Sequence, residues 1–249
     1  MIKGKNTLVI LAAGSGTRLR PLTDSTPKGM VKLGDRSLIE QLLDHFNEWA
    51  DQIVLVTGYC SEKIEDFVEN TEFGKPIHLI HNKNFDVTNS LYSAWLTREF
   101  WSTSEELIFS NSDVVFRENA LSEFLTNDSS IVLSVDEKAC DREDMKVSIH
   151  NETNLVTRVS KEIALDQSFG EFTGISKLRG NGLAAFDRTI HEMLKEEKMK
   201  RNGWYDLAFN QMAQGNQEID FVSLPENSYM EIDTLEDLAD SKKVIEKYW

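Results

Sequence analysis

The sequence predicts an α/β fold: a single Rossmann-like, mostly parallel sheet flanked by helices, with a small antiparallel β insertion near residues 140–180. Apolar runs of strand length alternate with amphipathic helical segments over residues 8–135, as in parallel sheets with crossover helices. A glycine-rich turn follows the first apolar run, where open α/β sheets bind ligands. Near residue 140 the pattern changes to short segments of alternating polarity, which predicts antiparallel strands.

The first part of the chain supplies the parallel strands. The run Leu8–Leu11 is apolar throughout, as expected for a strand that is buried on both faces. The segment that begins at Ser37 has apolar residues at helical spacing, and Trp49 is the last of them. By the same criteria we expect strands at 8–11, 53–57, 77–80, 107–110 and 131–135 and helices at 37–50, 61–69, 89–100 and 120–125.

The second part of the chain begins with a hairpin. Two segments of alternating polarity flank the turn residues Asn151 to Asn154, which is a hairpin signal. Thr234 is the expected N-cap of the last helix, because Glu236 and Asp237 follow in its first turn. The expected elements are strands at 146–150, 156–160, 219–223 and 230–232 and helices at 183–198, 205–214 and 234–247.

Length and charge limit the class of protein. The 249 residues suit one large domain over residues 1–249, since 4 prolines and 13 glycines leave no room for a linker rich in these residues. The net charge of −15 argues against nucleic acids and anionic membranes as partners. Residues 1–34 nevertheless carry a net charge of +5, which suits a local site for a polyanion such as a nucleoside triphosphate.

The remaining composition favours a cytoplasmic protein. Cys60 and Cys140 lie far apart and show no metal-binding spacing, and we expect both thiols to be free. The N-terminus lacks a secretory signal pattern, and no run approaches 18 apolar residues. The sequence leaves open whether the chain forms a homodimer.

The glycine-rich turn and the cations after it predict a polyphosphate site. Gly14 and Gly16 let the backbone approach phosphates closely, and Arg18 and Lys28 supply cations that neutralise phosphate oxygens. The turn lacks the Gly-Lys-Ser/Thr end of a P-loop, and Leu19 stands where the dinucleotide fingerprint has its third glycine. A solvated turn with surface cations is the simpler alternative.

Two aspartates are candidate Mg²⁺ ligands. Asp113 follows the strand expected at 107–110, and Asp233 follows the strand expected at 230–232. Mg²⁺ prefers carboxylate oxygens at rigid positions, and open sheets collect ligands at the carboxyl ends of their strands. The alternatives are a turn residue for Asp113 and a helix-capping residue for Asp233.

Together these motifs resemble the CTP:phosphocholine cytidylyltransferase-like family of NTP transferases. The matching segments run in the family's order over most of the chain: Gly-Thr-Arg-Leu-Arg-Pro with Pro27-Lys28, Asn82, Thr-Asn-Ser-Leu-Tyr-Ser at 88–93, Ser-Asp-Val-Val-Phe at 112–116, Gly-Ile-Ser-Lys at 174–177 and Glu-Ile-Asp at 231–233. Sugar-phosphate nucleotidylyltransferases share the first motif but usually carry Gln-x-x-Pro-x-Gly-x-Ala in place of the segment at 88–93. This difference favours the cytidylyltransferases.

The resemblance implies one nucleotidyltransferase domain that binds CTP, Mg²⁺ and a phosphorylated acceptor. Lys28, Arg18 and Lys161 would act on the phosphates, with Lys161 as a cation for the acceptor phosphate, and Asp113 and Asp233 would hold the metal. For Lys161 a solvated lysine, and for Asn89 a helix N-cap, remain alternatives. Nucleotide-binding residues would be Leu11, Ala12, Ala13, Gly14, Ser15, Gly16, Thr17, Gly58, Tyr59, Thr88, Asn89 and Ser90.

The acceptor is the least determined part of the prediction. A quaternary ammonium needs an aromatic wall and a carboxylate, whereas carboxylates alone satisfy a primary amine such as phosphoethanolamine or 2-aminoethylphosphonate. Trp204 is a further aromatic candidate, although such aromatics more often belong to the core. Candidate acceptor-binding residues are Glu171, Tyr205, Asp206, Tyr229 and Glu231.

Three functions follow. The first is a cytidylyltransferase that joins CMP from CTP to a phosphorylated amine or alcohol, releases pyrophosphate and needs no covalent enzyme intermediate. The second is a sugar-1-phosphate nucleotidylyltransferase that uses UTP or dTTP. The third is a non-catalytic nucleotide-binding regulator on the same fold, which the presence of both Asp113 and Asp233 disfavours.

Overall fold

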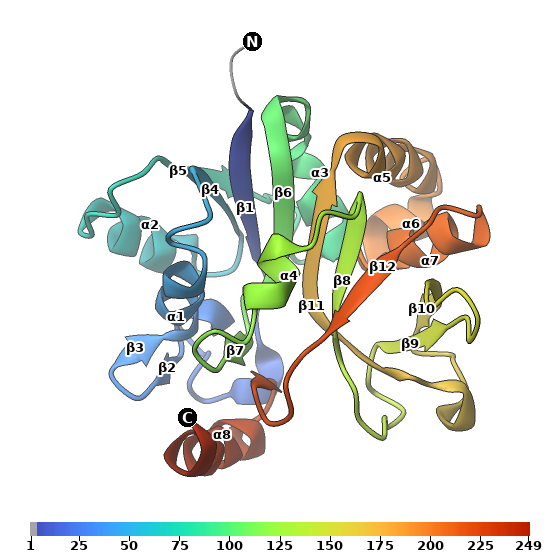
Figure 1. Cartoon of the computed structure of the whole chain (residues 1–249). Coiled ribbons are helices and arrows are strands. Elements are labelled where there is room, and N and C mark those ends of the chain that lie inside the picture. Colours follow the sequence, from blue (N-terminus) through green and yellow to red (C-terminus); the bar gives the residue numbers. More distant parts are fainter. Residues whose placement is uncertain (1–3) are drawn as a thin grey trace.

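The computed structural model describes residues 4–249 and is built around a nine-stranded sheet (Figure 1). Strands β1, β4, β5 and β6 are parallel, β12 is parallel to β8, and β11 runs antiparallel to β6, β8 and β9. The predicted fold class, a mostly parallel sheet flanked by helices, is therefore confirmed. The strands are β1 (Lys5–Ala12), β4 (Gln52–Thr57), β5 (Ile77–His81), β6 (Ser104–Asn111), β8 (Ile131–Asp136), β9 (Lys146–Ile149), β10 (Val156–Ser160), β11 (Gly170–Arg179) and β12 (Asp220–Ser223).

Helices cover both faces of this sheet. Leu8 and Ile10 of β1 pack into the apolar cluster with α1, α2 and α4, while Val9 and Leu11 pack into the one with α3, α5 and α7. Successive side chains of a strand point to opposite faces, so an all-apolar strand is the expected consequence of two covered faces. Figure 1 shows α1 and α2 on one side of β1 and α5 and α7 on the other. The helices are α1 (Leu38–His45), α2 (Ser61–Glu69), α3 (Ser90–Leu96), α4 (Ser122–Thr126), α5 (Gly180–Met193), α6 (Glu197–Asn202), α7 (Leu207–Gln214) and α8 (Leu235–Tyr248).

Smaller elements stand at one end of the sheet. Strands β7 (Val114–Phe116) and β13 (Tyr229–Glu231) form a separate antiparallel pair. Asp233 therefore follows a strand outside the main sheet, which corrects the expectation that it ends a strand of that sheet. The remaining short elements are β2 (Lys32–Leu33), β3 (Arg36–Ser37) and the 3₁₀ helices η1 (Thr17–Leu19), η2 (Lys28–Met30), η3 (Arg98–Thr103) and η4 (Leu165–Gln167).

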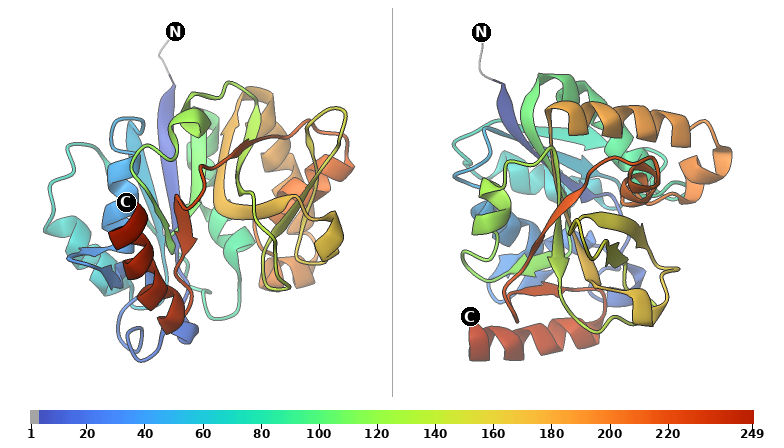
Figure 2. Two further views of the ribbon diagram at one scale, coloured as in Figure 1. Left: turned by 60° about the horizontal axis from the view of Figure 1, so that its bottom comes forward. Right: turned by 45° about the vertical axis from the view of Figure 1, so that its right-hand side comes forward.

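The last helix closes this end. The Thr234 hydroxyl accepts from the backbone N–H of Asp237 at 3.1 Å, and a carboxylate oxygen of Asp237 accepts from the N–H of Thr234 at 2.7 Å. This capping box confirms Thr234 as the N-cap. Leu238 of α8 joins Leu19 in a small apolar cluster, so α8 is anchored beside the loop after β1 (Figure 2).

Two helices are shorter in the structure than expected. Helix α1 ends at His45, and the Lys75 ammonium takes the carbonyl of Ala50 at 2.8 Å. Helix α3 ends at Leu96, where the buried Thr97 hydroxyl donates to the carbonyl of Ala94 at 2.7 Å. The helix expected at 183–198 begins three residues earlier as α5 and is followed by a separate α6.

Strand β11 was missed as a ten-residue strand because polar residues such as Thr173 and Ser176 lie within it. Its pairing with β8 shifts register between Phe172 and Ser176, and Gly174 in this bulge has a φ of +76°. The predicted hairpin at 146–160 is confirmed as β9–β10. Because β11 pairs with β9, this insertion extends the main sheet. Among the described residues, no helix is long and apolar enough to cross a membrane.

Candidate active site

Two adjoining pockets lie where the loop after β1, the start of α3 and the end of β6 meet. The larger has a volume of about 920 Å³ and the smaller about 230 Å³. Gly14, Lys28, Asn89, Asp113 and Asp206 line both. The shared residues come from the predicted phosphate loop, a predicted metal position and the predicted base and acceptor regions.

The loop after β1 has the geometry that its glycines predict. Gly16 has a φ of +57°, and a Cβ there would lie 2.9 Å from Cβ of Lys28, so a larger residue would displace the lysine. The Thr23 hydroxyl donates to the carbonyl of Gly16 at 2.7 Å and holds the turn. A Cβ on Gly14 would meet no heavy atom within 4 Å, so the loop is open at that position.

Lys28 lies at the junction of the two pockets. Its ammonium is 2.5 Å from a carboxylate oxygen of Asp113 and also pairs with Asp233, while Arg18 pairs with Asp233 from the outside. Burial by itself would lower the pKa of Lys28, but the two carboxylates outweigh it and raise that pKa. The lysine is therefore cationic at neutral pH.

Glu231 completes a group of three carboxylates. One oxygen each from Asp113, Glu231 and Asp233 lie within 4.8 Å of one another. Burial, with help from the charges of Asp113 and Asp233, raises the pKa of Glu231 to about 8. Oδ1 of Asp113 is buried and has no hydrogen-bond partner. The three carboxylates and this unpaired oxygen are a donor set that a hard divalent cation would satisfy.

The wall of the smaller pocket is a network of neutral hydrogen bonds. The buried Asn82 amide donates to the hydroxyls of Thr88 at 3.1 Å and Ser93 at 3.0 Å. The side-chain Oδ1 of Asn89 accepts from the backbone N–H of Ser90 at 2.8 Å, so Asn89 is the N-cap of α3. Asn89 also lines both pockets. This network fixes the segment expected to surround cytosine and ribose.

Charged residues of the insertion form the far wall of the larger pocket. Lys138 pairs with Glu171 at 2.7 Å and with Asp144 at 3.5 Å. Burial raises the pKa of Glu171 to about 7, although the neighbouring Lys138 opposes this shift. Burial would lower the pKa of Lys138, but Glu171 outweighs it, so that pKa is raised. Asp136 lies on the same wall.

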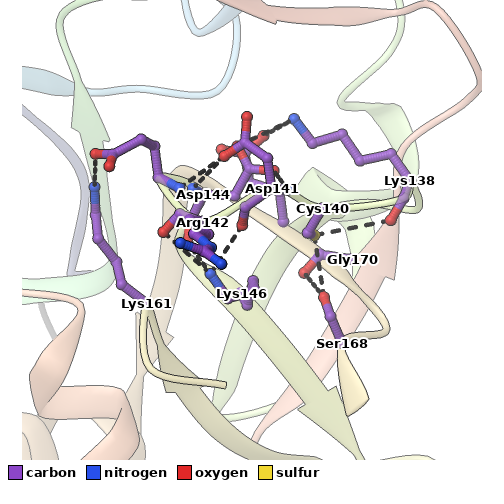
Figure 3. A network of polar contacts seen from close by, with 11 residues as sticks. Lys138, Cys140, Asp141, Arg142, Asp144, Lys146, Lys161, Ser168 and Gly170 are labelled. Atoms are coloured by element: carbon purple, nitrogen blue, oxygen red, sulfur yellow. Dashed lines mark hydrogen bonds and ion pairs between the residues drawn. The ribbon is translucent and has the colours of Figure 1, made fainter. Parts of the chain in front are cut away.

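A buried lysine holds the loop between β8 and β9, which carries Lys138 and Asp144. The Lys146 ammonium, on a side chain that is almost fully buried, donates to the backbone carbonyls of Asp141 at 3.0 Å and Asp144 at 3.1 Å (Figure 3). From the other side of the loop, Lys161 lies 3.8 Å from a carboxylate oxygen of Glu143. The Lys161 ammonium also stands 5.4 Å from the centre of the Trp204 ring.

The structure brings most of the predicted site residues to the two pockets. Lys161, Glu171 and Glu231 line the larger pocket, Thr88 and Ser90 line the smaller one, and Asp206 lines both. Predicted residues that line at least one pocket are Leu11, Ala13, Gly14, Gly16, Thr17, Arg18, Lys28, Thr88, Asn89, Ser90, Asp113, Lys161, Glu171, Tyr205, Asp206, Tyr229, Glu231 and Asp233.

Four predicted nucleotide-binding residues line neither pocket: Ala12, Ser15, Gly58 and Tyr59. A Cβ on Gly58 would lie 2.6 Å from the carbonyl oxygen of Ala13, so this glycine permits a close backbone approach. Tyr59 donates its N–H to Ala13 at 3.1 Å and its hydroxyl to the carbonyl of Asp24 at 2.7 Å. Both residues therefore contact the loop after β1 without lining a pocket.

Tyr205 and Tyr229, two of the candidate acceptor-binding residues, are largely buried. Tyr205 is 1% exposed, packs against Phe172 and Phe209, and donates its hydroxyl to the carbonyl of Gly174 at 2.9 Å. Tyr229 is 9% exposed. Their rings supply buried apolar area, and Tyr205 also ties down the bulge of β11.

The sequence did not assign several residues of the pockets. Asn111 at the end of β6 lines both pockets, and Lys138, Asp136 and Asp144 line the larger one. Asn111 lies two residues before Asp113 in the sequence, and this proximity was an available signal. Asp136 is the last residue of β8, and Lys138 and Asp144 lie in the loop after it, whose polar pattern resembles any solvated loop.

Comparisons with known proteins agree with this architecture. The chain is 26% identical over 199 residues to the bifunctional protein GlmU of Methanocaldococcus jannaschii, a match that covers 80% of this chain and 44% of that protein. It is 36% identical over 92 residues to the choline-phosphate cytidylyltransferase of Streptococcus pneumoniae, covering 36% of this chain and 38% of the relative. The chain thus spans less than half the length of these curated relatives.

A solved structure matches nearly the whole chain. The CTP:phosphocholine cytidylyltransferase of Streptococcus pneumoniae superposes with a TM-score of 0.80 at 21% identity, over 97% of this chain and 99% of that one. At this identity the match shows the shared fold. The nucleotidyl transferase family model matches residues 7–139, just over half of the chain. The chain therefore belongs to the nucleotidyl transferase family.

Proposed function

We propose that residues 1–249 form one cytidylyltransferase domain that transfers CMP from CTP to a phosphorylated small amine or alcohol and releases pyrophosphate. The observation that carries this proposal is the junction of the two pockets. There Lys28 and Asp113 lie between the open glycine-rich loop and the charged wall of the larger pocket. The smaller pocket would take the nucleoside and the larger one the acceptor. The similarity to choline-phosphate cytidylyltransferase supports CTP as the donor.

Asp113, Asp233 and Glu231 would hold Mg²⁺. Their oxygens lie within 4.8 Å of one another, and Oδ1 of Asp113 lacks a partner. Glu231 was expected in the acceptor site, but its position beside Asp113 favours a place at the metal. When bound, the ion would stabilise negative charge on the transferring phosphate.

The residues of the chain position the reactants. The open loop at Gly14 leaves its backbone free to bind the triphosphate. Lys28 and Arg18 would neutralise the phosphates of the nucleotide. Lys161, which also lines the larger pocket, would bind the phosphate of the acceptor. An acceptor oxygen would attack the α-phosphorus in line, forming a new P–O bond as the bond to pyrophosphate breaks. The reaction then needs no covalent enzyme intermediate.

A sugar-1-phosphate nucleotidylyltransferase is the second candidate. The chain is 35% identical over 112 residues to the UTP–glucose-1-phosphate uridylyltransferase AglF of Haloferax volcanii, a longer match than the 92 residues shared with the choline-phosphate enzyme. The pocket charges count against it, since eleven carboxylates and four cations line the described part of the larger pocket. A hexose 1-phosphate carries no cation to offset that excess.

Pyrophosphate release from a matrix of substrates tests both functions. CTP, UTP and dTTP would each be paired with phosphoethanolamine, phosphocholine, 2-aminoethylphosphonate and glucose 1-phosphate in the presence of Mg²⁺. We expect turnover with CTP and a phosphorylated amine. Turnover of UTP or dTTP with the hexose phosphate alone would favour the second candidate. CTP binding without product in any pair would favour a non-catalytic regulator.

A further inference from the structure

We propose, on the basis of the proposed function, that the acceptor carries an ammonium group with N–H bonds, and that the larger pocket selects it against a trimethylammonium group. The substrate class is then a primary amine separated by a short chain from a phosphate or phosphonate. Asp206 is the residue that we assign to this selection. The inference rests on which groups of the pocket are free to contact a cation.

The aromatic groups of the larger pocket do not form a cage around a quaternary ammonium. Among the described residues, the aromatic side chains that line the larger pocket are Phe172, Trp204 and Tyr229. Phe172 and Tyr229 are 4% and 9% exposed. Trp204 is the exposed member, but the Lys161 ammonium already stands 5.4 Å from its ring centre, within cation–π range.

The carboxylates of the pocket, in contrast, are numerous and incompletely paired. Asp206 is 8% exposed, lines both pockets, and its Oδ1 has no hydrogen-bond partner. Glu171 shares a single close cation, Lys138, with Asp144. A buried carboxylate oxygen without a donor is costly, and an N–H of the acceptor would supply that donor.

The two kinds of ammonium differ in what they offer these carboxylates. A primary ammonium donates three hydrogen bonds, whereas a trimethylammonium donates none and binds mainly through aromatic faces. A site built to accept N–H bonds rejects an analogue that lacks them, because its own polar groups are then buried without partners. Methylation of the nitrogen should therefore weaken the acceptor progressively.

A methylation series on the unmodified protein tests this directly. Initial rates would be measured with CTP and Mg²⁺ for phosphoethanolamine, its N-methyl and N,N-dimethyl derivatives, and phosphocholine. We expect kcat/KM to fall with each methyl group and by at least about tenfold over the series. A parallel measurement with 2-aminoethylphosphonate distinguishes a phosphonate acceptor from a phosphate ester. In either case the primary amine should have a higher kcat/KM than phosphocholine.

Two variants test the assigned residues through the ratio of kcat/KM for phosphoethanolamine to that for phosphocholine. Asp206→Asn should reduce this ratio at least threefold, with Asp187→Asn on the exposed face of α5 as its control. Trp204→Ala should leave the ratio within about twofold, because its ring does not bind the acceptor nitrogen.

The outcomes separate this inference from the proposed function. Phosphocholine turnover at equal or higher kcat/KM than phosphoethanolamine overturns the inference and leaves the cytidylyltransferase proposal in place. A selective loss of phosphocholine turnover in Trp204→Ala overturns it as well. An unchanged ratio in Asp206→Asn overturns the role of Asp206. Absence of turnover with CTP and every amine overturns the proposed function itself.

Discussion

The two pockets are walled by different kinds of groups. The smaller pocket is shaped by amides and hydroxyls that already bond one another, with Asn82 at the centre. The larger pocket is lined by many charges, and several of them share partners, as Lys138 does with Glu171 and Asp144. The difference teaches that hydrogen bonds preorganise the proposed nucleoside pocket, whereas charge would govern what the proposed acceptor pocket binds.

Lys28 and Asp113 belong to both regions. In the structure Lys28 neutralises Asp113 and Asp233, the same carboxylates that we propose as metal ligands. Substitutions at this junction should therefore affect the use of both CTP and the acceptor, whereas substitutions farther from it should affect only one of the two substrates.

The largest effect is expected at Asp113. Asp113→Asn should lower kcat at least about a thousandfold and leave the fold intact, because it removes a proposed metal ligand and the several kcal/mol that the ion contributes to the transition state. Single-turnover kinetics and circular dichroism measure the two properties. Asp187→Asn is the matched control at an exposed carboxylate. A rate near that of the unmodified protein would remove Asp113 from the metal site.

The next largest effect is expected at Lys28. Lys28→Met should lower kcat about a hundredfold and weaken CTP binding much less, because its charge acts on oxygens that become more negative during transfer. Stopped-flow rates and equilibrium CTP titration measure both quantities. Lys32→Met, at an exposed lysine of β2, is the control. Equal and small effects of the two substitutions would make Lys28 a structural cation only.

A smaller, one-sided effect is expected at Asn82. Asn82→Ala leaves the hydroxyls of Thr88 and Ser93 without the amide donor, and lost buried hydrogen bonds of this kind cost about 1–3 kcal/mol. We expect CTP to bind about tenfold more weakly while KM for the acceptor changes less than twofold. Asn70→Ala, at an exposed asparagine that follows α2, is the control. Equal losses for both substrates would show that the pockets are not independent.

The last effect concerns stability rather than catalysis, and it depends on pH. Burial raises the pKa of Asp206 from 3.8 to about 7, so the folded protein holds a proton that the unfolded chain has lost. The free energy of unfolding should therefore fall as the pH rises from about 4 to about 7. Asp206→Asn should flatten this dependence by up to about 1.4 kcal/mol for each unit of the pKa difference. Urea denaturation at several pH values measures it, and a slope as steep as that of Asp187→Asn would contradict it.

The sequence by itself determined the alternating elements, the glycine-rich turn after β1 and the capped last helix. These features depend on local rules. An apolar run between turns forms a strand, Gly16 is needed for a positive φ, and Thr234 with Asp237 forms a capping box within four residues. For the same reason Lys28 could be placed near the loop, since Pro27 and the 3₁₀ turn after it act over a short distance.

The tertiary structure alone decided which charges share a site. Glu231 joins the carboxylates of Asp113 and Asp233 because β13 pairs with β7 beside Asp113, and Lys138 meets Glu171 because β11 runs beside β8. It also decided that the Lys161 ammonium lies 5.4 Å from the centre of the exposed Trp204 ring. These partners are far apart in the chain, and their pairing depends on strand order and register. No local preference encodes either, because the energy that selects them comes from burying the whole sheet between its two layers of helices.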